Sequence, residues 1–288
     1  MNTIKTAALM ALLMALMVVI GQAFGGTSGA TIMLIIALAI NFGTYWFCDT
    51  MVLKSYGAEP IERSQAPELY DLVEKLAANA GLPMPRVAII NSEVPNAFAT
   101  GRNPDNAVVA VTTGIMRTLN YNELAGVLGH ELAHVKHRDI LISTLAATMA
   151  TFISYIANML QWAAIFGGRS DDDDNGGIVG TLAVIIIAPI AASLIQLAIS
   201  RSREFSADEE GGRICGNPNF LANGLEKIEY YALNAPPMQQ ATPATAHMFI
   251  VNPLEGSKKF LKNLFSTHPD TGERIARLRE QASLMRVR

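Results

Sequence analysis

Two histidines and a glutamate stand close together in the middle of the chain, in the order His130-Glu131-Leu132-Ala133-His134. In a helix, residues four positions apart lie on one face, about 6 Å apart along the axis, so both imidazole rings can reach one metal ion. The carboxylate of Glu131 would project beside them, where it can take a proton from water activated by the metal. The spacing therefore predicts a metal-dependent hydrolytic centre with Glu131 as the general base.

A hydrolytic zinc ion usually takes three protein ligands and leaves one position for water, so a third ligand is needed. The candidates are His137, His268 and an acidic residue further along the chain. His137 would share one straight helix with the other two histidines, which is a poor arrangement for a tetrahedral ion. Glu204 and Asp208 lie four residues apart, so a helix places them on one face. We expect Glu204 to complete the ligand set and Asp208 to accept a hydrogen bond from a ligating histidine.

The charge distribution indicates how residue 204 reaches the histidine pair. Half of the 288 residues are hydrophobic and only 16% are charged, against about 25% in soluble domains. Four windows contain no Asp, Glu, Lys or Arg, namely 7–24, 29–48, 140–166 and 178–199. Each is long enough to cross the hydrocarbon core of a bilayer as a helix. The first window could also be a signal peptide, and the last two could form a buried or partly embedded helical hairpin.

Basic residues predict the side of the membrane on which each loop lies. Of the 22 Lys and Arg residues, all but Arg169 lie before the first window or in the segments 49–139 and 200–288. Four crossings would place both segments in the cytoplasm, where Glu204 can meet the histidines. His134 and Glu204 each lie a few residues from a predicted span, so we expect the centre within about 10 Å of the membrane surface.

The chain is therefore expected to have four consecutive parts. These are two N-terminal transmembrane helices in 1–48, a cytoplasmic segment in 49–139, a transmembrane pair with a short external loop in 140–199, and a cytoplasmic segment in 200–288. Hydrophobic spacing predicts helices over 66–80, 121–138, 200–213, 220–233 and 269–283, and strands over 86–90, 96–100 and 107–113. The turn-rich joint between the last two strands predicts a hairpin.

Other features exclude some classes of protein. The net charge is −3 and there is no basic stripe, so a nucleic-acid partner has no electrostatic support. Two cysteines, Cys48 and Cys215, do not make a disulfide framework and are expected to be free thiols in a reducing compartment. His247 fits no pattern and is expected in a proline-containing loop over 235–257.

The motif His130-Glu131-x-x-His134, followed by Ser202-Arg203-Glu204-Phe205-x-Ala207-Asp208 between paired apolar windows, resembles the HtpX family of membrane zinc endopeptidases. It is similar, more distantly, to the Ste24-type prenyl-protein proteases. The resemblance implies an α+β zincin-like metalloprotease domain, mainly helical with a small sheet, interrupted by four transmembrane helices. It also implies one zinc ion per subunit, with His130, His134 and Glu204 as ligands and Glu131 as the catalytic base.

The resemblance further implies that Asn96-Ala97-Phe98-Ala99 forms the sheet edge along which an extended substrate pairs. It assigns His268 and Arg274 to the closing of the site, as catalytic groups beside the developing oxyanion. From the residues alone, the strand 96–100 could equally be internal and His268 could be a helix cap. The oligomeric state is not predicted.

The same resemblance implies a multi-pass protein of the bacterial inner membrane. Its expected partners are the lipid bilayer and unfolded polypeptides or misfolded or damaged membrane proteins, which it would cleave on the cytoplasmic side in a stress response. Two other hypotheses for the function remain. One is Ste24-like processing of lipid-modified proteins, and the other is a membrane zinc-binding protein without enzymatic activity.

Overall fold

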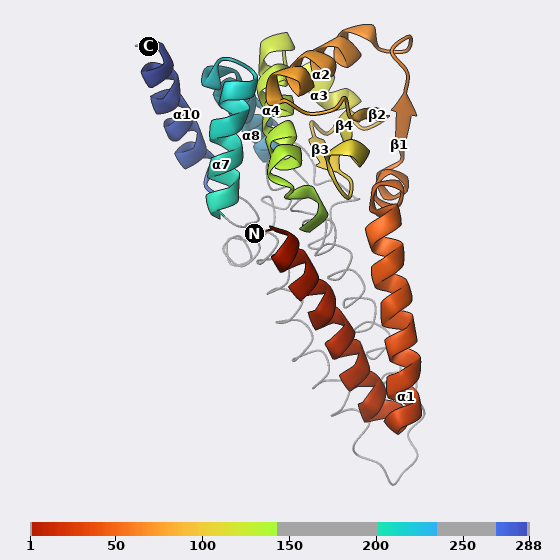
Figure 1. Ribbon diagram of the computed structural model, residues 1–288. Helices are drawn as coiled ribbons and strands as arrows, with labels where there is room; N and C mark the ends of the chain where they lie inside the picture. Colours follow the sequence, from red (N-terminus) through yellow and green to blue (C-terminus); the bar gives the residue numbers. More distant parts are fainter. Residues whose placement is uncertain (1, 143–200, 235–268, 287–288) are drawn as a thin grey trace.

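The computed structural model describes residues 2–142, 201–234 and 269–286 (Figure 1). Nearly all of the windows 140–166 and 178–199 lie outside the described residues, as do His247 and His268. Within the described part, the fold is mostly helical with one small mixed sheet. This agrees with the expected class of a mainly helical α+β domain.

The first two uncharged windows form one long kinked helix, α1 (Asn2–Tyr56). Its helical geometry breaks at Gly25 and Gly26, where Gly26 has φ 57°, a value that glycine adopts without a steric penalty. The two arms fold back beside each other (Figure 1). The Asn41 side-chain amide donates a hydrogen bond to the Met10 carbonyl at 3.2 Å, which joins the arms.

Among the described residues, the arm Gly25–Tyr56 is long and apolar enough to cross a membrane. The other arm contains a shorter apolar helix, Thr6–Gln22. Large apolar side chains on the longer arm are exposed, with Ile35, Phe42 and Phe47 each more than half accessible. An extended apolar surface of this kind is what a lipid-facing helix requires.

A four-stranded sheet follows α1. Its strands are β1 (Ala58–Ile61), β2 (Arg86–Ile90), β3 (Ala97–Thr100) and β4 (Val108–Thr112), in the order β1-β2-β4-β3. β2 and β4 are parallel, whereas β1 pairs antiparallel with β2 and β3 antiparallel with β4. The expected hairpin is confirmed, and its connection contains a short 3-10 helix, η1 (Pro104–Asn106). β3 is therefore an edge strand of this sheet.

Five further helices correspond to the predicted ones, with ends that differ by a few residues. They are α2 (Pro67–Ala80), α4 (Tyr121–His137), α7 (Arg201–Ile214), α8 (Pro218–Asn234) and α10 (Thr271–Arg286). Three elements were not predicted, namely β1, η1 and the short helix α3 (Thr113–Thr118), and the first residue of α3 was expected to extend a strand. The Thr112 hydroxyl accepts a hydrogen bond from the Ile115 amide and starts α3 instead.

Helix α4 lies at the centre of the domain and contacts α2, α7, α8 and β3. It begins with a capping box between Asn120 and Glu123, which satisfies two amides of its first turn. A side chain at Gly126 would lie 2.3 Å from the Leu221 amide of α8, and one at Gly211 would lie 2.7 Å from the His130 amide. These glycines therefore permit close helix contacts, and the second contact holds α7 against the histidine motif.

The two cysteines are free, as predicted. Cys48 is buried in α1, and Cys215 follows α7 with its thiol bonded to the carbonyls of Gly212 and Asn217. Burial raises the pKa of the Cys215 thiol, so it is a weaker nucleophile than an ordinary exposed cysteine.

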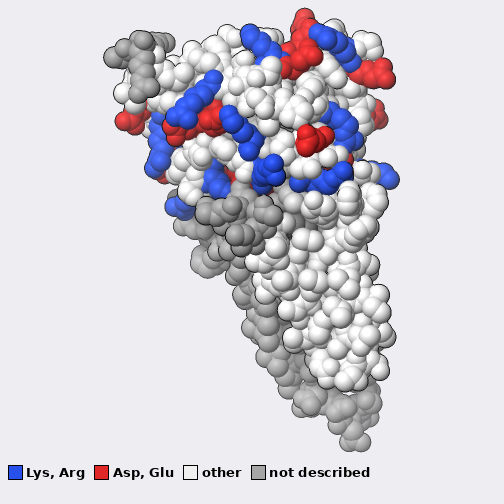
Figure 2. Space-filling view, in the orientation of Figure 1, with Lys and Arg blue, Asp and Glu red and all other residues white. Residues whose placement is uncertain are grey.

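The polar domain is attached to the end of the apolar hairpin. Figure 2 shows Lys and Arg side chains gathered where the charged domain meets the uncharged helices. The Arg102 guanidinium lies 4.7 Å from the centre of the Trp46 ring, and Arg86 forms an ion pair with Asp49. Trp46 and Asp49 both belong to α1, so these contacts tie the sheet to the end of the apolar helix.

Candidate metal centre

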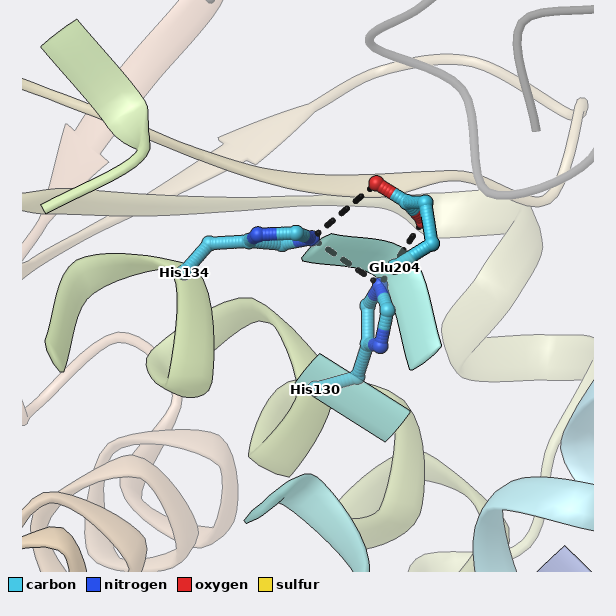
Figure 3. A group of neighbouring side chains, drawn as sticks. All are labelled: His130, His134 and Glu204. Carbon is cyan, nitrogen blue, oxygen red and sulfur yellow. Dashed lines mark hydrogen bonds and ion pairs between the residues drawn. The ribbon is translucent and has the colours of Figure 1, made fainter. Parts of the chain in front are cut away.

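Three side chains from two helices converge on one point (Figure 3). The Nε2 atoms of His130 and His134 on α4 lie 3.2 Å apart. Glu204 on α7 places its two carboxylate oxygens 3.7 Å from His130 Nε2 and 3.6 Å from His134 Nε2. Ligand atoms around a tetrahedral zinc ion with bonds of 2.0–2.1 Å are separated by about 3.3 Å. The donor types and their spacing therefore fit zinc.

His130 is supported from behind by a buried ion pair. Its Nδ1 lies 2.9 Å from Asp208 Oδ1, and Arg274 of α10 binds both oxygens of Asp208 at 2.7 and 2.8 Å. Burial alone would raise the pKa of Asp208, but the charge and hydrogen bonds of Arg274, with the hydrogen bond to His130, hold it well below its ordinary value. Asp208 is thus a carboxylate that can accept the Nδ1 proton of His130.

His134 faces a different carboxylate, Asp139, whose Oδ2 lies 3.4 Å from His134 Nδ1. Burial alone would lower the pKa of His134, but its contact with Asp139 and the negative charges of Glu204 and Glu131 raise it to about 9. Without a metal, the ring therefore holds a proton at neutral pH. Its position among three carboxylates is favourable for a cation.

Glu131 lies between the histidine pair and the sheet. It is buried, and its Oε2 accepts a hydrogen bond from the backbone amide of Ala99 at 3.0 Å. Since the Ala99 amide bonds to Glu131, it faces away from β4. The structure thus brings together the expected base and the segment 96–99, in which Asn96, Ala97 and Phe98 are buried and Ala99 is partly exposed.

The remaining predicted residues have different placements. Arg274 is almost completely buried and binds both carboxylate oxygens of Asp208, so it supports His130 through that carboxylate. His268 lies outside the described residues. His137 is partly buried at the end of α4 and is not part of the metal-binding group found among the described residues.

Asp139 is the neighbour that sequence reasoning missed. It is buried and follows the helix end by two residues. Its position depends on Arg138, which adopts a left-handed conformation with φ 58°, uncommon for a residue other than glycine. A histidine motif followed by an acidic residue just past the helix end is the signal that could have indicated it.

The central helix with its paired histidines, the glutamate from a second helix and the apolar hairpin define a membrane zinc metalloprotease of the HExxH type. Comparison with known proteins gives the same class and identifies the family within it. The chain belongs to peptidase family M48, whose family model matches residues 63–282. Two HtpX homologs, each more than half identical to this chain, confirm the resemblance to the HtpX-type endopeptidases.

The similar proteins cover nearly the whole chain. A protease HtpX homolog of Thermodesulfovibrio yellowstonii is 58% identical over 98% of this chain and 99% of its own length. Another, of Thermococcus kodakarensis, is 56% identical over 99% of this chain and 97% of its own length. The crystal structure of S. mikatae Ste24p shares the fold, with a TM-score of 0.53 at 17% identity, over 96% of this chain and 67% of that chain.

The raised pKa of His134 predicts how zinc affinity depends on pH. A zinc ligand must be the neutral imidazole, so below about pH 9 a proton on His134 competes with the metal. We expect the apparent zinc affinity to increase by up to about tenfold per pH unit between pH 7 and 8.5 and to level off above about pH 9. Competition with a chelator of known pH dependence measures it. An affinity that stays constant from pH 7 to 8.5 would contradict the assignment.

Proposed function

We propose that this protease hydrolyses peptide bonds of unfolded or misfolded membrane proteins on the cytoplasmic side of the membrane. The observation that carries the proposal is the position of Glu131, which lies beside the histidine pair and is bonded to the edge strand at Ala99. An extended polypeptide can add to such an edge by main-chain hydrogen bonds. Its carbonyl groups would then lie next to the proposed base.

His130, His134 and Glu204 are the residues proposed to hold zinc, which, when bound, polarises the scissile carbonyl and lowers the pKa of water at the site towards about 7. Glu131 removes a proton from the attacking water and passes it to the leaving amine. Asp208 holds His130 in the orientation that presents Nε2 to the centre. We include His268 and Arg274 in the site by resemblance, with Arg274 acting through Asp208.

The proposed topology follows from the apolar windows and the basic residues. Four spans, two in 1–48 and two in 140–199, would place both polar segments in the cytoplasm. The packing of α4 of the first segment against α7 of the second supports a common side of the membrane for the two polar segments. By the positive-inside rule, the proposed side is the cytoplasm.

Membrane vesicles of both orientations test the proteolytic function together with the side of the membrane that the active site faces. A soluble unfolded polypeptide and an unfolded membrane protein are added outside inverted and right-side-out vesicles that contain the protein. We expect zinc-dependent cleavage with inverted vesicles, whose cytoplasmic face is exposed, and none with intact right-side-out vesicles. Cleavage only in right-side-out vesicles would overturn the orientation. Cleavage only of a prenylated peptide would favour selective processing of lipid-modified proteins instead.

A further inference from the structure

The two histidines of the centre have similar surroundings. The Nδ1 of His130 faces Asp208, which is held by Arg274. The Nδ1 of His134 faces Asp139, whose other oxygen, Oδ1, lies 4.0 Å from Nη1 of Arg203. The Nδ1 atom of each histidine thus faces a carboxylate, and an arginine lies on the other side of that carboxylate.

The end of α4 explains why Asp139 lies beside His134. Arg138 turns the chain with φ 58° and ψ 37°. The Asp139 amide then donates a hydrogen bond to the His134 carbonyl at 2.9 Å, and the Arg138 amide to that of Val135 at 3.1 Å. This is a helix-ending turn that brings the next residue back over the last turn of the helix. Asp139 is only 3% exposed, so its carboxylate is held inside the protein.

Arg203 connects this turn to the second ligand-bearing helix. It directly precedes Glu204 in the first turn of α7, and its side chain is only 13% exposed. Two neighbouring residues of one helix turn therefore contact the two parts of the site: Glu204 faces the histidines, and Arg203 faces Asp139. The contact joins the turn that ends α4 to the first turn of α7, from opposite sides of the segment 143–200 in the sequence.

We propose that Asp139 is a positioning residue for His134 and that Arg203 holds Asp139 in place. Asp139 accepts the Nδ1 proton of His134, which fixes the tautomer that presents Nε2 to zinc and increases the basicity of the ring. The inference rests on the zinc site of the proposed function and assigns it a second supporting carboxylate. Removing such a partner of a ligating histidine typically weakens metal binding by 10- to 100-fold.

The test measures metal binding without any peptide substrate. Zinc affinity is determined by chelator competition, and the visible spectrum of the Co²⁺-substituted protein reports the geometry of the site. We expect Asp139→Ala to bind zinc about 10- to 100-fold more weakly and to change the Co²⁺ spectrum. Arg203→Met should produce a smaller change in the same direction. Asp105→Ala is the matched control, because Asp105 is exposed in η1, and it should match the wild type.

Asp139→Asn keeps an acceptor oxygen of the same size and separates positioning from packing. Because it lacks the negative charge, we expect it to keep the Co²⁺ spectrum close to that of the wild type but to bind zinc more weakly, and its zinc affinity decides the question if the alanine variant does not fold. Wild-type zinc affinity with an unchanged Co²⁺ spectrum in the folded alanine variant, or wild-type zinc affinity in the asparagine variant where alanine unfolds, would overturn the proposal. A wild-type protein that binds zinc but cleaves nothing would contradict only the proposed function.

Discussion

Replacement of Glu131 by Gln is expected to reduce peptide hydrolysis by about three orders of magnitude and to leave zinc bound. Glutamine has the shape of glutamate and can still accept the hydrogen bond from the Ala99 amide, but it cannot take a proton from water. The three proposed metal ligands are unchanged. Initial cleavage rates and zinc content, measured on the same purified sample, check both parts of the expectation.

The control for this variant is Glu123→Gln in the same helix. Glu123 is also buried, but it belongs to the capping box and pairs with Lys227 at 2.7 Å. A glutamine at this position of a capping box can keep the bond to the Asn120 amide, so we expect near-normal activity. If Glu131→Gln cleaved substrate at a rate close to that of the wild type, Glu131 would not be the base.

The local part of this centre could be predicted from spacing alone. The helical repeat places His130 and His134 on one face, and an amphipathic pattern with a polar cap indicated the helix that holds them. The prediction of Glu204 as the third ligand needed one further step. The charge distribution had to place the residues before and after the segment 143–200 on the same side of a membrane. The contact between α4 and α7 agrees with that step.

The parts that could not be predicted depend on backbone details or on contacts between distant residues. Arg138 ends α4 in a left-handed conformation, which sequence patterns expect of Gly or Asn rather than Arg. Arg274 reaches Asp208 across 66 positions of the chain, and no local pattern reveals that contact. β1 has only four residues and contains a proline and a glutamate, so nothing in its composition marks it as a strand.

Replacement of Arg274 by Met is expected to lower the free energy of unfolding by about 3–5 kcal/mol, because it leaves the charge of Asp208 buried without the guanidinium that balances it. Arg274 is 1% exposed and provides both of the guanidinium bonds to that carboxylate. For a domain of this size the loss corresponds to a decrease of roughly 10 °C in Tm. Thermal unfolding of the detergent-solubilised protein measures it.

The matched control is Arg277→Met, the same substitution one turn further along α10. The Arg277 guanidinium is exposed, pairs with Glu273 and lies 3.7 Å from the centre of the Phe205 ring. Exposed ion pairs contribute about 0–1 kcal/mol, so this variant should unfold close to the wild-type temperature. An equal decrease in Tm in the two variants would show that the ion pair of Arg274 with Asp208 contributes no more to stability than an exposed ion pair.

The loss of unfolding free energy in Arg274→Met, called the deficit below, should depend on pH in a way that identifies its cause. In the wild type, Arg274 holds the pKa of Asp208 well below its ordinary value, against the effect of burial. The pair therefore stabilises the fold above the unfolded pKa of about 3.9, and this contribution is lost only as the pH falls further. Without Arg274, burial raises that pKa, so Asp208 becomes protonated as the pH falls from 7 towards 5. The deficit should shrink over this range and should be partly removed at pH 7 by adding Asp208→Asn. A deficit that is independent of pH and unaffected by Asp208→Asn would mean that lost packing, and not an unpaired charge, causes it.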